Sequence, residues 1–181
     1  TGRRYQNLHL GVKKNMFQRV SYQPKEEQKQ TITLDKTESL FDTEFAGYPA
    51  KYATKDGIPM RAWSKTKTTL KDLDTTRLHY VKVPENLILI EFDLKDENGD
   101  KCLSKNLEAA SIFPQTYAEL SKSGKGVHLH YFWEGDVSKL RRIWSDSIEV
   151  KVFTGKSSLR RQLTKCNDIP IAHINSGLAL K

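Results

Sequence analysis

The sequence is poor in cysteine. Only Cys102 and Cys166 occur among 181 residues, with no CxxC pair and no group of His and Cys at the spacing of zinc ligands. Disulfide-stabilised domains and structural zinc sites both depend on such patterns, so neither is expected here. This cysteine usage fits a protein of a reducing, cytoplasmic compartment.

Long apolar runs and several common motifs are also missing. No stretch approaches the roughly 20 apolar residues that span a bilayer, and no apolar segment near the start makes a signal peptide, so we expect a soluble protein without a membrane partner. The G-x-x-x-x-G-K-[ST] spacing of a Walker loop does not occur, which excludes an ATPase built on that loop. Because the chain begins with Thr1 rather than Met, we expect it to be one domain of a longer polypeptide.

Basic charge is abundant by contrast. The 30 Lys and Arg residues outnumber the 22 Asp and Glu residues and leave a net charge of +8. A polyanion, with nucleic acid as the first candidate, is therefore the expected partner. The 37% of apolar residues is enough to bury a core, and the length of 181 residues is that of one domain.

Apolar periodicity and turn residues predict an α+β fold. The patterns predict strands and helices, in chain order, at 87–92 (strand), 103–113 (helix), 116–120 and 127–133 (strands), 137–145 (helix) and 148–153 (strand). Ser104 is the expected N-cap of the first helix. The order β-α-β-β-α-β is the ferredoxin-like arrangement of RNA-recognition (RRM) modules. In this arrangement the first strand lies between the third and the fourth.

The first 80 residues give weaker patterns. They predict a short strand at 31–34 and a helix at 36–45. We therefore expect a single domain with two lobes, in which residues 1–80 form an additional N-terminal α/β lobe and residues 81–181 form the RRM-like lobe.

Acids and histidines alternate along the predicted strands. Side chains point to opposite faces in turn, so Glu91 and Asp93 share one face of the first strand, Glu149 lies on the fourth, and His128 and His130 share one face of the third. Carboxylates gathered at one edge suit Mg²⁺, which prefers oxygen ligands. The alternative is a pair of solvated acids where the strand runs into a loop.

The turn between the second and third strands could bind phosphate. In Ser121-Lys-Ser-Gly-Lys-Gly126 and the following His128, glycine lets backbone N–H groups approach an anion, and Ser121, Ser123, Gly124, Lys125 and His128 are the candidate nucleotide-binding residues. The alternative is a glycine-containing hairpin turn beside a core histidine.

Two basic segments are candidate phosphate contacts. One follows the last predicted strand, where a solvated loop is the alternative, and the other carries an aromatic side chain able to stack on a base. Their residues are Lys156, Arg160 and Arg161 in the first, and Arg61, Trp63, Lys65 and Lys67 in the second.

Three motifs in this order resemble the archaeo-eukaryotic primase superfamily, most closely the primase-polymerase domains of phages and mobile elements. The family pattern is an acidic pair on a strand, then Ser-Gly-x-Gly-x-His, then a single acid on a later strand. Here Glu91-Phe92-Asp93, the segment 123–128 and Glu149 match these motifs. The family usually has Asp at both positions of the pair, so Glu91 is a departure, and Asp96 stands as an alternative ligand. The resemblance covers residues 85–165.

The resemblance implies a function and its components. It implies a DNA primase or polymerase that transfers nucleotides from NTP or dNTP along a single-stranded DNA template, in the bacterial host cytoplasm if the protein is phage-encoded. It implies that Glu91, Asp93 and Glu149 are catalytic and hold two Mg²⁺ or Mn²⁺ ions, that His128 contacts the incoming triphosphate, and that a helicase domain or partner acts with the chain. Arg160 and Arg161 lie where the family has a segment near the nucleotide.

Three alternatives stay open. Asp93 with Glu149-Val-Lys151 matches the D…ExK pattern of metal-dependent nucleases, although it leaves the segment 123–128 without a role. The His128-Leu-His130 triplet fits the metal motif of rolling-circle nicking enzymes, but no Tyr follows Tyr131 to act as their nucleophile. A nucleic-acid-binding module without catalysis is the third, although the first strand has acids where RNA-recognition modules have aromatics.

Overall fold

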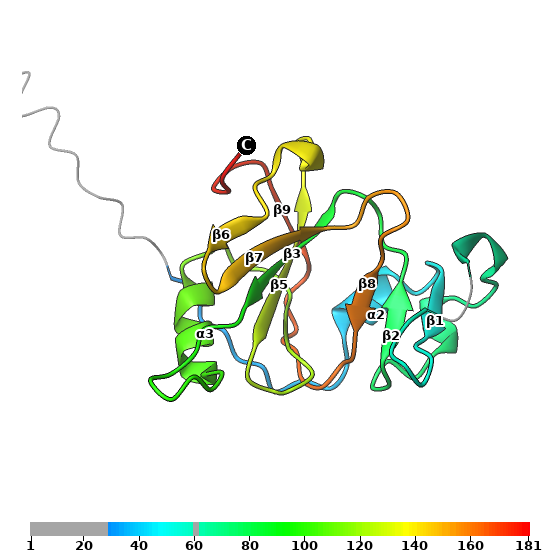
Figure 1. Ribbon diagram of the computed structural model, residues 1–181, viewed down its shortest axis with the longest axis horizontal. Coiled ribbons are helices and arrows are strands. Elements are labelled where there is room, and N and C mark those ends of the chain that lie inside the picture. Colours follow the sequence, from blue (N-terminus) through cyan, green and yellow to red (C-terminus); the bar gives the residue numbers. More distant parts are fainter. Residues whose placement is uncertain (1–28, 60–61) are drawn as a thin grey trace, which may run out of the picture.

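The computed structural model describes residues 29–59 and 62–181 (Figure 1). This part of the chain is a mixed α+β structure dominated by two antiparallel sheets, one of six strands and one of three, with two short α-helices. The α+β class expected from the sequence is therefore confirmed.

The six-stranded sheet contains β3 (Leu87–Phe92), β4 (Ala118–Leu120), β5 (Val127–Trp133), β6 (Ile143–Ser145), β7 (Ile148–Val152) and β9 (Ala172–Ile174). The three-stranded sheet contains β1 (Ala50–Tyr52), β2 (His79–Val81) and β8 (Leu159–Arg161). The helices are α2 (Leu40–Glu44) and α3 (Leu103–Ser111), and the 3-10 turns are η1 (Trp63–Lys65), η2 (Leu70–Asp72) and η3 (Val137–Lys139).

The order of the large sheet is β4-β5-β3-β7-β6, and β9 adds to β5 in parallel. The strand at 87–92 thus lies between the strands at 127–133 and 148–152, as the sequence predicts. Of the two predicted helices, the first forms α3, although it begins after Cys102 and not at Ser104.

The predicted helix at 137–145 is wrong. Asp136 Oδ1 accepts from the backbone N–H of Ser138 and caps a single 3-10 turn, η3. The chain then forms β6, which pairs with β7 across the two-residue turn 146–147. The β-forming side chains Ile143 and Trp144 favour this hairpin over a second helical turn, and Trp144 packs against the Phe113 ring with centroids 5.3 Å apart.

The N-terminal predictions are confirmed in part. The helix expected at 36–45 is shorter, because α2 begins only after Ser39, whose Oγ accepts from the backbone N–H of Asp42 at 3.2 Å. No strand forms at 31–34, although Ile32 and Leu34 pack against the main core. Their alternation reflects this packing and not strand pairing.

The strand β3 sends its side chains into two cores. Ile88, Ile90 and Phe92 belong to the core under α3. Leu87 and Leu89 belong to a second core, which contains residues of α2 and of the small sheet. Glu91 follows Leu89 on this second face but lies outside the second core. The polar part of the face therefore begins where α2 and the small sheet no longer cover β3.

The small sheet joins distant parts of the chain. Its central strand β2 pairs with β1 on one side and with β8, 80 residues later, on the other. The boundary expected at residue 80 falls inside β2, so the two halves of the sequence share this sheet. Among the described residues, no helix is long and apolar enough to cross a bilayer.

Candidate functional site

Four polar residues form one row across the large sheet. Strand register places Glu119 of β4 opposite His128 of β5, His128 opposite Glu91 of β3, and Glu91 opposite Glu149 of β7. Directly opposite residues in antiparallel strands share a face, with Cβ atoms about 5 Å apart. The structure therefore brings together the histidine and two of the three acids that the sequence singled out.

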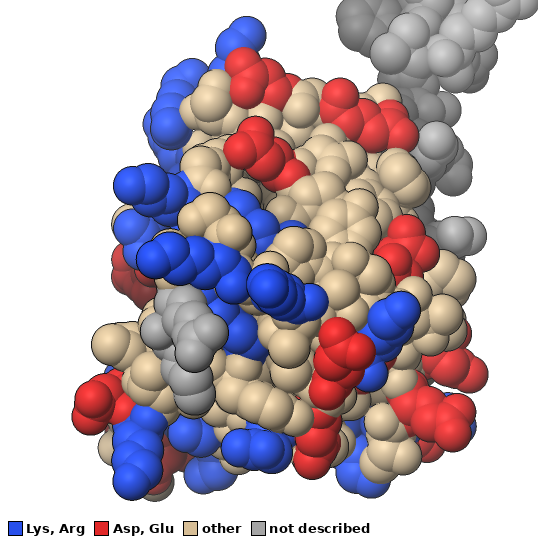
Figure 2. All heavy atoms as spheres, turned by 90° about the vertical axis from the view of Figure 1, so that its right-hand side faces the viewer, with Lys and Arg blue, Asp and Glu red and all other residues tan. Residues whose placement is uncertain are grey.

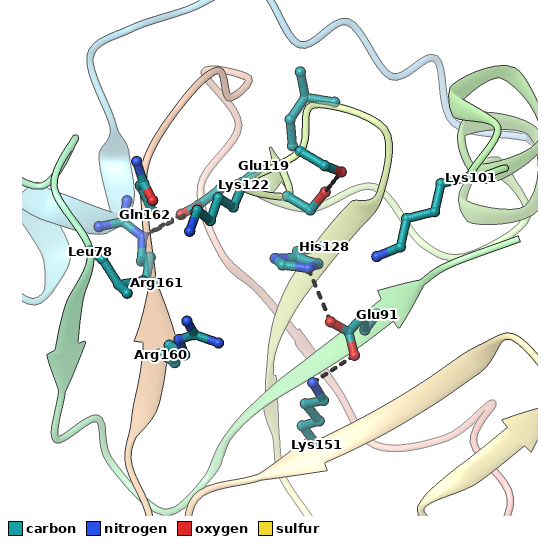
Figure 3. A pocket seen from close by; sticks show the side chains of 13 residues that line it. Leu78, Glu91, Lys101, Glu119, Lys122, His128, Lys151, Arg160, Arg161 and Gln162 are labelled. Carbon is teal, nitrogen blue, oxygen red and sulfur yellow. Dashed lines mark hydrogen bonds and ion pairs between the residues drawn. The ribbon is translucent and has the colours of Figure 1, made fainter. Parts of the chain in front are cut away.

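The central acid of this row, Glu91, has two positively charged or ionisable neighbours. His128 Nε2 lies 3.4 Å from its Oε1, and Lys151 Nζ lies 2.6 Å from its Oε2 (Figure 3). The polar contact with His128 and the ammonium group of Lys151 outweigh partial burial and lower the pKa of Glu91 to about 2. The carboxylate is thus ionised throughout the physiological range.

The other two acids also have basic neighbours. Asp93 continues the face of β3 beyond Glu91, and its Oδ1 lies 2.8 Å from Lys101 Nζ. Glu149 is more exposed, and its nearest cation is Arg142, whose guanidinium is 4.0 Å away.

The three acids Glu91, Asp93 and Glu149 line a single cavity of about 350 Å³, together with Lys95, Asp146 and Ser147. Three carboxylates supply the oxygen donors that Mg²⁺ and Mn²⁺ prefer, so the donor set fits such an ion. Within residues 29–59 and 62–181, however, no three His, Cys, Asp or Glu side chains are grouped closely enough to hold a metal ion as they stand. Two of these carboxylates contact lysines instead, Glu91 with Lys151 and Asp93 with Lys101.

The loop between β4 and β5 lies against the acidic pair. Ser121 Oγ accepts from the backbone N–H of Gly126 at 2.9 Å and contacts Ser123 Oγ at 3.1 Å, which closes the loop on itself. A Cβ atom on Gly126 would lie only 2.9 Å from Asp93 Oδ1. The glycine is therefore needed for this close approach, and it joins the two motifs physically.

A cleft of about 470 Å³ opens beside this loop (Figure 3). Five basic side chains and two carboxylates line it, so its charge favours an anionic ligand. Figure 3 shows His128 between Glu91 and the part of the cleft near Lys122 and Glu119. The lining residues are Leu78, Glu91, Lys101, Glu119, Leu120, Ser121, Lys122, Ser123, His128, Lys151, Arg160, Arg161 and Gln162.

Most of the predicted nucleotide-binding residues line this cleft. Gly124 and Lys125 do not. Gly124 has a φ of 74° and makes the turn, whereas the carbonyl of Lys125 accepts from Asn106 Nδ2 at 2.8 Å. Gly124 and Lys125 thus shape the loop and do not form part of the cleft wall.

Arg161 reaches the cleft but is committed to a buried network. Its Nε donates to Glu119 Oε1 at 2.7 Å, its Nη1 to Asp42 Oδ1 at 2.6 Å, and its Nη2 to Ser39 Oγ at 3.1 Å. The guanidinium also lies over the ring of Phe41, 4.3 Å from the centroid. These contacts tie β8 to β4 and to the start of α2, which is a structural role, whereas the adjacent Arg160 is exposed.

The same network holds two other titratable groups. Burial alone would raise the pKa of Glu119, but the positive charge of Arg161 together with the hydrogen bonds from Arg161 and Tyr117 leaves this pKa below its usual value. Burial lowers the pKa of His130 to about 3, so this histidine is neutral. His130 shares a face with His128, as predicted, but it lies in the interior.

The second predicted basic segment lies apart from the cleft. Neither Trp63, Lys65 nor Lys67 is among the residues that line it, and Arg61 lies outside the described residues. Lys51 Nζ lies 4.0 Å from the centroid of the Trp63 ring. Figure 2, which views the molecule from the right-hand side of Figure 1, shows Lys and Arg side chains along the left side and the lower part of this face, with Asp and Glu side chains among them.

Lys156 lies in the exposed loop between β7 and β8, also away from the cleft lining. Lys82 holds this loop, since its Nζ donates to the carbonyl groups of Gly155 and Ser157, at 2.6 Å in each case. Lys156 therefore does not join the predicted nucleotide-binding residues that line the cleft.

Sequence reasoning missed Lys101, Lys122 and Glu119. Glu119 lies two residues after Tyr117 and therefore shares a face of the predicted strand with it, and this parity was available in the sequence. Its pairing with Arg161 was not available, because it depends on how the small sheet packs on the large one. Lys101 approaches Asp93 through the loop after β3, for which the sequence has no periodic signal.

Comparison with known proteins adds no family assignment: no protein-family model matches the chain, and no curated protein matches it at a significant level.

Proposed function

We propose that the chain is a metal-dependent nucleotidyltransferase of the primase-polymerase type that extends a strand along single-stranded DNA. The observation that carries the proposal is the meeting of three distant segments at one place. Glu91 of β3 lies between His128 of β5 and Glu149 of β7, and Asp93, directly after β3, lies against Gly126 of the loop before β5. This is the set of residues that the primase-like pattern requires at one site.

The strand order also supports a ferredoxin-like catalytic core. Four antiparallel strands lie in the order β4-β5-β3-β7, which is compatible with such a core, although η3 and β6 stand where its second helix is expected. The polar row lies on the face of this sheet that α3 does not cover.

Each group has a role in the proposed reaction. Glu91, Asp93 and Glu149 would hold Mg²⁺ or Mn²⁺, which lowers the pKa of the attacking 3′ hydroxyl and neutralises charge on the phosphates. His128, Ser121 and the exposed Arg160 line the cleft where a triphosphate would bind. The ionised Glu91 orients His128 toward that cleft through their 3.4 Å contact.

Single-stranded DNA is the proposed template, and the excess of basic residues supports a phosphate-rich partner. The lysines near Trp63 and the loop with Lys156 are proposed to contact the strand away from the catalytic row. A helicase domain or partner stays a prediction from the resemblance.

The test is primer extension on single-stranded DNA with NTP or dNTP and Mg²⁺ or Mn²⁺. We expect synthesis by the wild type and a loss of about a hundredfold or more in Asp93→Asn, because the variant loses one charged metal ligand. The matched control is Glu134→Gln, which also neutralises a carboxylate but lies in an exposed contact with His173. No synthesis by the wild type, or full activity in Asp93→Asn, would overturn the proposal.

A second variant decides between two possible ligands. Asp96 Oδ1 accepts from the backbone N–H groups of Asn98 and Asp100, at 2.9 and 3.0 Å, which is the geometry of a self-capped loop. We therefore expect Asp96→Asn to change loop stability and to retain synthesis.

A nucleic-acid-binding module without catalysis is the second candidate. The lysine-paired state of Glu91 and Asp93 favours it, because the acids are neutralised without any metal. Binding of single-stranded DNA that weakens with salt but ignores both Mg²⁺ and nucleoside triphosphate, together with absent synthesis, would support this candidate. Cutting of DNA without nucleotide in the same assays would instead point to the nuclease pattern.

A further inference from the structure

Two lysines contact the acidic pair Glu91 and Asp93 and also line the neighbouring cleft. Lys151 Nζ is 2.6 Å from Glu91 Oε2, and Lys101 Nζ is 2.8 Å from Asp93 Oδ1. Both lysine side chains also line the cleft of about 470 Å³ beside the loop. The same ammonium groups therefore face the carboxylates and the space for an anionic ligand.

The two pairs come from independent parts of the fold. Lys151 is on β7, two residues after Glu149 and on the same face of the sheet. Lys101 lies in the turn before α3. Both carboxylates of the acidic pair thus have an ammonium neighbour, and each neighbour is contributed by a different element.

These pairs affect any cation that binds the acids. A divalent ion at Glu91 and Asp93 must displace the ammonium groups or lie beside them, and like charges a few ångströms apart repel. A triphosphate in the cleft offsets the cost of displacing the lysines, because its oxygens accept hydrogen bonds from the displaced ammonium groups. Binding of the ion and binding of the triphosphate are therefore linked through the lysines.

We propose that Lys101 and Lys151 are internal counter-ions that make binding of the divalent cation depend on binding of the nucleoside triphosphate. The inference rests on the proposed function, and it goes further in assigning two positioning residues and a coupling between the two ligands. Without nucleotide, the lysines hold the carboxylates; with nucleotide, they contact its phosphates and release the acids. Linkage is reciprocal, so the cation strengthens nucleotide binding by the same factor.

The experiment measures Mn²⁺ binding by the electron paramagnetic resonance signal of free Mn²⁺. The wild type, Lys151→Met and Lys122→Met are compared with and without a non-hydrolysable nucleoside triphosphate analogue. Lys122 is the matched control, because it lines the same cleft and pairs with no carboxylate in the part of the chain that the structure describes. Circular dichroism verifies that each variant is folded.

We expect Lys151→Met to bind Mn²⁺ alone about two- to fivefold more tightly than the wild type, the upper part of the range for removal of one competing, partly exposed ion pair. The strengthening that the analogue confers on Mn²⁺ binding should shrink by a similar factor. Lys122→Met should leave binding of Mn²⁺ alone unchanged. Lys151→Arg retains the positive charge and should behave as the wild type.

Two outcomes would overturn the inference, and they are distinguishable. If Lys151→Met and the wild type bind Mn²⁺ equally, while Glu149→Gln binds it more weakly, the counter-ion role is wrong and the metal site stands. If Mn²⁺ binds no variant even with the analogue, both the counter-ion role and the metal-dependent function fail.

Discussion

Replacement of Arg161 by leucine tests whether this residue is structural. The wild-type guanidinium has a side-chain exposure of 3%, and its partner Glu119 has 2%. In Arg161→Leu, the carboxylate of Glu119 would keep only its hydrogen bond from Tyr117 Oη at 2.9 Å and the distant His130. Asp42 would lose its 2.6 Å contact as well.

The expected loss of stability is large. Removal of one partner of a buried ion pair costs about 3–5 kcal/mol, because it leaves the other charge unpaired in the interior. For a chain of this size, this corresponds to a fall of about 6–20 °C in Tm. Arg160→Leu, one residue earlier on the exposed side of β8, should change the free energy of unfolding by only about 0.5 kcal/mol.

The assay is urea unfolding followed by circular dichroism, with nucleotide binding measured on the folded protein. Arg160→Leu should weaken binding of a nucleoside triphosphate without affecting stability. The double variant Arg161→Leu with Glu119→Leu should recover much of the lost stability, since it removes both charges. Equal unfolding midpoints for Arg161→Leu and Arg160→Leu would refute the structural role of Arg161.

Two further predictions concern the loop and the acidic pair. Gly126→Ala should reduce primer extension strongly, because its Cβ would lie 2.8 Å from Ser121 Oγ and 2.9 Å from Asp93 Oδ1, whereas Gly124→Ala, with a φ of 74° and open space, should cost about 1 kcal/mol of stability without moving Asp93. Equal synthesis by the two variants would contradict the contact. The second prediction is that Glu91 stabilises the fold fully above its ordinary pKa of 4.5 and progressively less as pH falls toward about 2, since its pKa is lowered in the folded state. Glu91→Gln should reduce this acid dependence in urea unfolding at pH 7 and pH 3, and an unchanged dependence would count against the pairing.

The candidate site was predictable where strand alternation alone decides the outcome. The apolar run before Glu91 predicts a central buried strand, and alternation places Asp93 on the same face. The expected position of His128 follows from the same rule, and the register shows it opposite Glu91. Alternation along each strand decides which side chains share a face, and the register of β3 with β5 then brings Glu91 and His128 together.

The remaining features depend on packing between elements. The spacing of apolar residues at 137–145 is compatible with a helix, but pairing with β7 makes part of it a strand. Arg161 looks like a phosphate-binding residue in a basic run, and only the packing of β8 beside β4 buries it. The pairing of Lys101 with Asp93 likewise depends on a loop conformation that has no sequence period.

The row across the large sheet shows how position gives different roles to the same residue type. Along β4, β3 and β7 the three glutamates Glu119, Glu91 and Glu149 have side-chain exposures of 2%, 20% and 38%. The first is covered by the network around Arg161 and is structural, whereas the second is partly covered and paired with Lys151. The third is open to solvent, so it has the lowest cost of exchanging its neighbours for a ligand. The small sheet covers one end of the row only, and this asymmetry separates the residue that holds the fold together from those free to bind.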